Sequence, residues 1–134
     1  MRAPRVGIDL VEVRAVRESV HRHGDRYLER VYTEREVADC RGAVGVDPSR
    51  LAARFAAKEA VVKLLRPGSE DPLPWRSIEV VRARGGWVEL ELHEPATSLA
   101  ARAGVTGLAI SLTHEAGFAS AAVVAESSNH EEPT

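Results

Sequence analysis

One apolar segment of the chain carries four charged residues whose types and spacing suit chemistry on a phosphate or an acid. Between Leu51 and Leu65 the sequence is apolar on nearly every side of a helix, yet it contains Arg54, Lys58, Glu59 and Lys63. At about 100° per residue, Lys58 falls within the most apolar stripe, whereas Glu59 and Lys63 lie beside it among alanines. The pattern predicts a mostly buried helix that presents an acid and a base one turn apart, with room for a ligand.

Lysine is used sparingly in this chain, since Lys58 and Lys63 are the only lysines among 18 basic residues. A position that keeps lysine where arginine is otherwise preferred indicates a need for a compact ammonium group. The alternative is that Glu59 and Lys63 form an ordinary helix-surface pair worth about 0.2–0.5 kcal/mol. Lys58 would then extend its ammonium group to the surface. Spacing alone favours this second interpretation.

A further acidic candidate, Asp9, lies in a short predicted strand from Arg5 to Val13. The strand alternates two rows of side chains, namely Val6, Ile8 and Leu10 against Gly7, Asp9 and Val11. Aspartate disfavours strands, so Asp9 either makes local hydrogen bonds at a strand end or is held there for chemistry. Both interpretations stand at this point. Gly7 would allow another backbone segment to approach closely.

The composition suits a single globular domain that has neither disulfides nor a signal peptide. The chain has 134 residues, of which 44% are hydrophobic, and one cysteine, Cys40. One thiol excludes an intrachain disulfide and a cysteine-based zinc site, which fits a reducing cytoplasm. The first residues lack the apolar core of a signal peptide, and no run is long enough to span a membrane. We therefore expect a cytoplasmic protein with no membrane segment.

The charge is divided unevenly along the chain. Residues 1–66 hold 14 basic and 10 acidic side chains, whereas residues 67–134 hold 4 and 10. Aromatic residues make up only 4% and the basic residues are interspersed, which argues against nucleic-acid binding. A small acidic partner or a phosphorylated molecule fits better. On a predicted helix from Val13 to Arg22, Arg14, Arg17 and His21 share one face, which is either a solvated surface or a docking strip for an acidic helix.

The remaining pattern predicts an α+β domain. Helices are expected at 25–31, at 34–41 after the capping box that begins at Thr33, at 48–65 after the N-cap Asp47, and at 95–104. Strands are expected at 75–83 and 87–93 around Gly85-Gly86, and at 107–113 and 118–126 around a turn at 114–117. Residues 42–46 are expected to form a loop. The order predicts one domain, residues 1–126, with a mainly antiparallel sheet packed against the long central helix, and a disordered polar tail at 127–134.

Three segments together resemble the holo-acyl-carrier-protein synthase family of 4′-phosphopantetheinyl transferases. They are Gly7-Ile8-Asp9, the run from Arg54 to Ala60 with Lys63 beyond it, and Ser111-Leu112-Thr113-His114. The resemblance covers roughly Val6 to Glu126. It implies the phosphopantetheinyl transferase fold and transfer of the 4′-phosphopantetheine arm from coenzyme A to a serine of an apo acyl carrier protein. It also implies that 3′,5′-ADP is released, that Mg²⁺ is required, and that the carrier serves fatty acid or polyketide synthesis.

The same resemblance assigns roles to individual residues. It makes Asp9, Glu59 and Lys63 catalytic: the two carboxylates hold Mg²⁺, Lys63 contacts the phosphates, and Glu59 is the candidate to accept the serine proton. Coenzyme A binding falls to Arg54, Lys63, Gly86 and His114. Taken alone, His114 at a hairpin turn would more often be merely exposed.

The resemblance also concerns partners and assembly. It places Arg14 and Arg17 on the helix that docks acidic carrier proteins, and it implies a homotrimer with active sites between subunits. Two other functions stay open on the sequence. One is a non-catalytic module of the same fold that binds coenzyme A or the carrier protein, and the other is a structural oligomeric domain whose charged helix only forms salt bridges.

Overall fold

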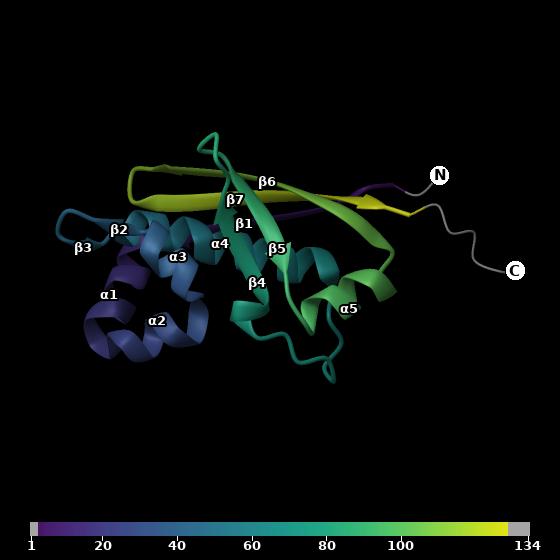
Figure 1. Cartoon of the computed structure of the whole chain (residues 1–134), viewed down its shortest axis with the longest axis horizontal. Coiled ribbons are helices and arrows are strands. Elements are labelled where there is room, and N and C mark those ends of the chain that lie inside the picture. The colour runs from purple at the N-terminus through teal and green to yellow at the C-terminus, as the bar shows by residue number, and fades with distance from the viewer. Residues whose placement is uncertain (1–2, 129–134) are drawn as a thin grey trace, which may run out of the picture.

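A three-stranded antiparallel sheet and one long helix form the centre of the molecule (Figure 1). The computed structural model describes residues 3–128. The sheet has the order β1-β7-β6, with β1 at Arg5–Glu12, β6 at Val105–Glu115 and β7 at Phe118–Ser127. Helix α4, Pro48–Leu65, packs across β1 and β7. The expected α+β fold, an antiparallel sheet against a central helix, is confirmed.

The other elements are arranged around this centre. They are α1 (Val13–His23), α2 (Asp25–Val31), α3 (Glu34–Asp39), β2 (Arg41–Gly42), β3 (Gly45–Val46), β4 (Ile78–Arg82), β5 (Val88–Leu92) and α5 (Ala96–Arg102). In Figure 1 the long β6–β7 hairpin spans the molecule, with α1 to α3 near one end and α5 near the other. Within residues 3–128, no helix combines the length and the apolar character needed to cross a membrane.

Local capping hydrogen bonds set the helix boundaries where the sequence predicted them. Thr33 and Glu36 form the capping box of α3, with each side chain bonded to the backbone of the other residue. Asp47 caps α4 by accepting a hydrogen bond of 2.9 Å from the amide of Ser49. Arg66, with φ of 54°, ends α4 in the left-handed conformation just before Pro67. These predicted ends are confirmed.

Several predicted details of the strands and turns are wrong. Residues 42–46 are not a simple loop, because Arg41 pairs with Val46 in a short β2–β3 hairpin. Residues Trp75–Ser77 form a 3₁₀ turn, in which Ser77 bonds to the Pro74 carbonyl, and β4 starts only at Ile78.

The second hairpin is also longer than predicted. Its turn consists of Ala116 and Gly117 alone, with φ of 53° and 84°, so His114 and Glu115 belong to β6. Strand β7 continues through Ser127, the first residue of the predicted tail. Residues 129–134 of that tail lie outside the described residues.

Candidate active site

Strand β1 lies directly on helix α4, and this contact builds the site. A Cβ atom at Gly7 would lie 2.0 Å from the carbonyl oxygen of Ala60, so only glycine fits between the strand and the helix. Ala56, Ala57 and Ala60 are fully buried in the same contact. The expectation that the alanines of α4 leave room for a ligand is therefore wrong. They permit close packing, which brings the polar groups of β1 and α4 together.

Asp9 and Lys63 meet across this contact. Asp9 faces α4 because it shares the inward side of β1 with Gly7. The Lys63 ammonium donates to Oδ1 of Asp9 at 2.9 Å and to the carbonyl of Ile8 at 3.0 Å. The hydroxyl of Ser120 on β7 donates to the Asp9 carbonyl at 2.9 Å. Lys63 thus pairs with Asp9 rather than with Glu59, and the predicted ordinary helix-surface pair is absent from the ion pairs of residues 3–128.

Glu59 lies beside this pair and is partly buried. Burial and the charge of Asp9 raise the pKa of Glu59, and the Lys63 ammonium opposes that rise. Two carboxylates that repel one another in a partly desolvated place are a donor set that a hard divalent cation would stabilise. The residues of this site therefore fit a magnesium ion, with Asp9 and Glu59 as the oxygen ligands.

Lys58 does not extend to the surface, and that interpretation of the sequence is wrong. Its side chain is 0% exposed, and its ammonium donates to Oε1 of Glu36 at 2.8 Å. It also donates to the carbonyls of Trp75 at 3.1 Å and Ile78 at 2.5 Å. Burial lowers the pKa of Lys58, and the neighbouring Glu36 carboxylate opposes the shift. All three donor positions of the ammonium are thus used inside the protein.

Glu36 is a structural residue of the site region that sequence reasoning did not single out. Besides Lys58, its carboxylate accepts hydrogen bonds of 2.8 Å from the amides of Thr33 and Val80. The Lys58–Glu36 pair therefore joins α4 to α3 and β4, and it fixes the rotation of α4 next to Glu59. The available signal was the capping box, which marks Glu36 as a residue whose side chain turns back toward the protein.

Arg54 is not close to Asp9 and Glu59 within the chain. Five residues separate Arg54 from Glu59, which places the two about 140° apart around the helix axis. Arg54 is only 3% exposed, and its Nη1 donates to the Arg50 carbonyl at 3.3 Å. Its Nε has no hydrogen-bond partner within residues 3–128. A buried donor without a partner is uncommon and costly, and this atom is enclosed by the protein rather than open to solvent.

His114 and Gly86 also lie apart from the carboxylates. His114 pairs with Ala119, two rows beyond the row that contains Asp9, Ala121 and Leu112. From strand spacings this puts His114 roughly 12 Å from Asp9, on the same face of the sheet. Gly86, with φ of 97°, forms the tip of the β4–β5 hairpin.

The hairpin that carries Gly86 lies next to the strand that carries His114. A groove of about 390 Å³ separates β5 from β6. Its lining residues are Trp87, Val88, Glu89, Leu90, Leu108, Ala109 and Ile110. Asp9, Glu59 and Lys63 therefore form one cluster at the β1–α4 contact, whereas Arg54, Gly86 and His114 lie outside it.

Arg14 and Arg17 are exposed on α1, which begins directly after β1. Arg14 pairs with Glu18, one turn along the helix, at 3.3 Å, and both side chains are largely exposed. The first amide of α1, that of Val13, donates to the Gly117 carbonyl in the β6–β7 turn at 2.9 Å. The basic face of α1 thus starts five positions after Asp9 and next to the turn that follows His114.

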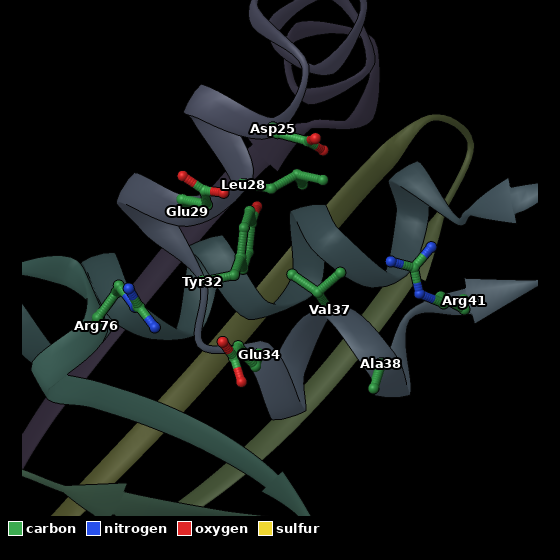
Figure 2. Close-up of a pocket in the computed structure, with 9 residues that line it drawn as sticks. All are labelled: Asp25, Leu28, Glu29, Tyr32, Glu34, Val37, Ala38, Arg41 and Arg76. Carbon is green, nitrogen blue, oxygen red and sulfur yellow. The ribbon is translucent and has the colours of Figure 1, made fainter.

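A separate cavity of about 460 Å³ lies between α2 and α3 (Figure 2). Its lining residues are Asp25, Leu28, Glu29, Tyr32, Glu34, Val37, Ala38, Arg41 and Arg76. Three carboxylates and two guanidinium groups give it mixed charge, and none of the predicted site residues lines it. This cavity is therefore distinct from the β1–α4 cluster.

Comparison with known proteins agrees with the fold. The family model of the 4′-phosphopantetheinyl transferase superfamily matches residues 5–122. A holo-[acyl-carrier-protein] synthase of Moorella thermoacetica is 43% identical over 126 residues, which is 94% of this chain and 96% of the relative. Another, from Solibacter usitatus, is 38% identical over 120 residues, covering 90% and 95%.

Two solved structures have folds similar to that of this chain. The ACPS–CoA complex of Chronobacterium ammoniagenes has a TM-score of 0.81 at 30% identity, over 96% of this chain and 100% of that chain. Helicobacter pylori holo-[acyl-carrier-protein] synthase, solved in complex with coenzyme A, has a TM-score of 0.76 at 28% identity, over 90% and 99%.

These matches extend over most of the chain and include β1, α4 and most of the β6–β7 hairpin. The chain therefore belongs to the 4′-phosphopantetheinyl transferase superfamily. Within it, the family is that of the holo-[acyl-carrier-protein] synthases, so the chain is an enzyme of this type. The family resemblance found in the sequence is confirmed.

Proposed function

We propose that this enzyme transfers the 4′-phosphopantetheine arm from coenzyme A to a serine of an apo acyl carrier protein and releases 3′,5′-ADP. The observation that carries the proposal is the convergence of Asp9, Glu59 and Lys63 at the β1–α4 contact. A relative with 43% identity that bears the holo-[acyl-carrier-protein] synthase name, and a similar structure of such an enzyme in complex with coenzyme A, support it. Membership of this enzyme family argues against a non-catalytic binding module or a purely structural domain.

The reaction needs charge stabilisation around a pyrophosphate. Asp9 and Glu59 would hold Mg²⁺, which when bound polarises the phosphorus and neutralises negative charge on the leaving group. Lys63 is more than half exposed, so its ammonium is free to turn from Asp9 toward the phosphates. As a compact point charge it stabilises the growing negative charge on the oxygens of the departing nucleotide.

Glu59 is the group best placed to accept the serine proton. The serine oxygen forms a bond to the phosphorus that carries the pantetheine arm, and the bridging P–O bond to 3′,5′-ADP breaks with its electron pair. The proton leaves the hydroxyl for Glu59, directly or through water. A carboxylate whose pKa is raised by burial and by Asp9 is a stronger base than an exposed glutamate, which supports this assignment.

The rest of coenzyme A is proposed to contact residues around the carboxylate cluster. The roughly 12 Å between Asp9 and His114 suits a nucleotide that extends from the cluster along the sheet. Gly86 lies on the hairpin beside β6, where its lack of a side chain leaves the backbone accessible. Arg54 is proposed to contact a phosphate of coenzyme A because the family resemblance implies that role.

The direct test is to incubate the protein with coenzyme A, Mg²⁺ and an apo carrier protein of fatty acid or polyketide synthesis, and to weigh the carrier by mass spectrometry. The proposal requires a mass gain equal to one phosphopantetheine arm, and replacement of Mg²⁺ by a chelator should prevent that gain. If several apo carriers show no gain in the presence of Mg²⁺, the proposed activity is wrong.

We propose that the exposed face of α1 docks the acidic carrier. The double substitution Arg14→Glu and Arg17→Glu should raise the KM for the carrier at least tenfold, because two attractive charges become repulsive at the interface. The KM for coenzyme A should change little. Steady-state kinetics with each substrate varied in turn measures both constants.

The matched control for that variant is Arg26→Glu with Arg30→Glu, which reverses two exposed arginines on α2 outside the proposed face. An equal rise in carrier KM for both double variants would show that only total charge matters and would remove α1 as the docking site.

We propose that the enzyme assembles as a homotrimer through the outer face of β1. Val6, Ile8 and Leu10 are 65%, 63% and 63% exposed in an edge strand of the sheet, and such an apolar row usually marks an interface. Light scattering coupled to gel filtration should give three times the chain mass. The substitution Ile8→Glu should lower that mass, whereas a wild-type mass of one chain would contradict the proposal.

A further inference from the structure

We propose that Glu79, Glu91 and His93 form a second metal site, which takes a divalent transition-metal ion such as Zn²⁺. The site lies on the face of the β4–β5 hairpin that α3 partly covers, and it uses none of the residues assigned to the reaction. Its donors are one imidazole nitrogen and two carboxylate oxygens, and all three lie within 4.8 Å of one another. Mixed nitrogen and oxygen donors distinguish this site from the all-oxygen pair of Asp9 and Glu59.

The strand pairing brings the three donors to one point. Glu79 on β4 is the direct cross-strand partner of Glu91 on β5, so their side chains lie on the same face. His93 follows Glu91 by two residues and shares that face. Its backbone amide donates to the Ser77 carbonyl at 2.8 Å, which continues the pairing beyond the last strand residue.

The observed separations suit a shared ion. Nε2 of His93 lies 3.0 Å from Oε1 of Glu79 and 4.0 Å from Oε1 of Glu91. Zinc binds nitrogen and oxygen ligands at about 2.0–2.2 Å, so two ligands of one ion lie no more than about 4.4 Å apart. Side-chain rotation of Glu91, which is half exposed, is enough to complete the set.

One ligand is already held in place. Glu79 is buried, and its Oε2 accepts a hydrogen bond of 2.5 Å from the Thr33 hydroxyl, which leaves Oε1 toward His93. Hydrogen bonds of this kind orient carboxylate ligands and strengthen metal binding. Glu91 and His93 are about half exposed, so an ion has an open approach from solvent and a water molecule can fill the remaining coordination position.

Arg35 on α3 is the competitor for these carboxylates. Its Nη1 lies 3.5 Å from Oε2 of Glu91 and 4.0 Å from Oε1 of Glu79, and its side chain is about half exposed. Two carboxylates against one guanidinium group leave one negative charge for a cation that displaces any proton from the imidazole. Metal binding requires the Arg35 side chain to rotate away from the carboxylates into the solvent. The affinity for the metal ion should therefore depend on the side chain at position 35.

The test is calorimetric titration of the full chain with Zn²⁺, in excess Mg²⁺ to occupy oxygen-only sites. Co²⁺ gives a second readout through its visible absorption. We expect one Zn²⁺ per chain, at least a tenfold loss of affinity in His93→Ala and in Glu91→Gln, and a severalfold gain in Arg35→Met. The matched control His21→Ala removes an exposed histidine of α1 and should leave the affinity unchanged.

Two results would overturn the site. Zinc affinity that is unchanged in both His93→Ala and Glu91→Gln would show that these residues do not bind the ion. Zinc binding that persists in His93→Ala but is lost in His21→Ala would place the ion on α1. Circular dichroism of each variant tests whether the fold is retained. His93 and Glu91 are both about half exposed, so if one variant does not fold, the other still tests the site.

Discussion

Replacement of Glu59 by glutamine is expected to reduce phosphopantetheine transfer by about 10²–10⁴-fold. The substitution keeps the size of the side chain but removes the negative charge that would bind Mg²⁺ beside Asp9, and it removes the group that accepts the serine proton. Single-turnover assays of the carrier at saturating coenzyme A and Mg²⁺ measure the loss. A rate equal to that of the unaltered enzyme would remove Glu59 from both roles.

A stability measurement on the same variant separates chemistry from folding. Burial and the Asp9 charge raise the pKa of Glu59, so its ionised form costs the folded protein stability above that pKa. Glutamine carries no charge, and Glu59→Gln should therefore unfold at an equal or higher temperature than the original enzyme. Glu12→Gln, at the exposed end of β1, is the control that should leave both rate and stability unchanged. A less stable Glu59→Gln protein would mean that its lost activity reflects a damaged fold.

Replacement of Lys58 by methionine is expected to destabilise the enzyme by roughly 3–5 kcal/mol. The change leaves the carboxylate of Glu36 charged and without its cation in the core, where Glu36 is 0% exposed. It also leaves the carbonyls of Trp75 and Ile78 without their donor. Urea denaturation, with the slope of the transition compared between variants, measures the loss of free energy of unfolding.

Lys63→Met is the matched control, because it removes the chain's other lysine from the same helix. Its ion pair with Asp9 is exposed on the lysine side, so the cost should be about 0–1 kcal/mol. The double variant Lys58→Met with Glu36→Gln should lose less than the sum of the single losses, since no uncompensated charge remains. Equal losses for Lys58→Met and Lys63→Met would show that the buried pair is unimportant to folding.

Features that depend on neighbouring residues could be predicted from the sequence. The capping box at Thr33 and the cap at Asp47 set helix ends through hydrogen bonds between residues two or three positions apart. The Gly85-Gly86 turn likewise fixes the register of its hairpin. Asp9, Glu59 and Lys63 were identified together only through the family resemblance, because spacing alone favoured a surface pair.

Features that depend on distant contacts could not be predicted. Lys58 is buried because its partner Glu36 stands 22 positions earlier, and no local pattern joins the two. The β2–β3 hairpin was missed because its strands have two residues each, too short to show alternation. The alanines of α4 could line a ligand or pack against a strand, and only the position of Gly7 opposite Ala60 decides between these alternatives.

The alternation of side chains along β1 limits where the chain can gain or lose a residue. Its inward row, with Gly7 and Asp9, contacts α4, while its outward row of Val6, Ile8 and Leu10 is exposed. Insertion or deletion of one residue within β1 would exchange the two rows. Asp9 would then face outward and an aliphatic side chain would meet Ala60. Length variation within β1 should therefore be rejected for two independent reasons, whereas the tip of the β2–β3 hairpin, where Val44 is almost fully exposed, should accept it.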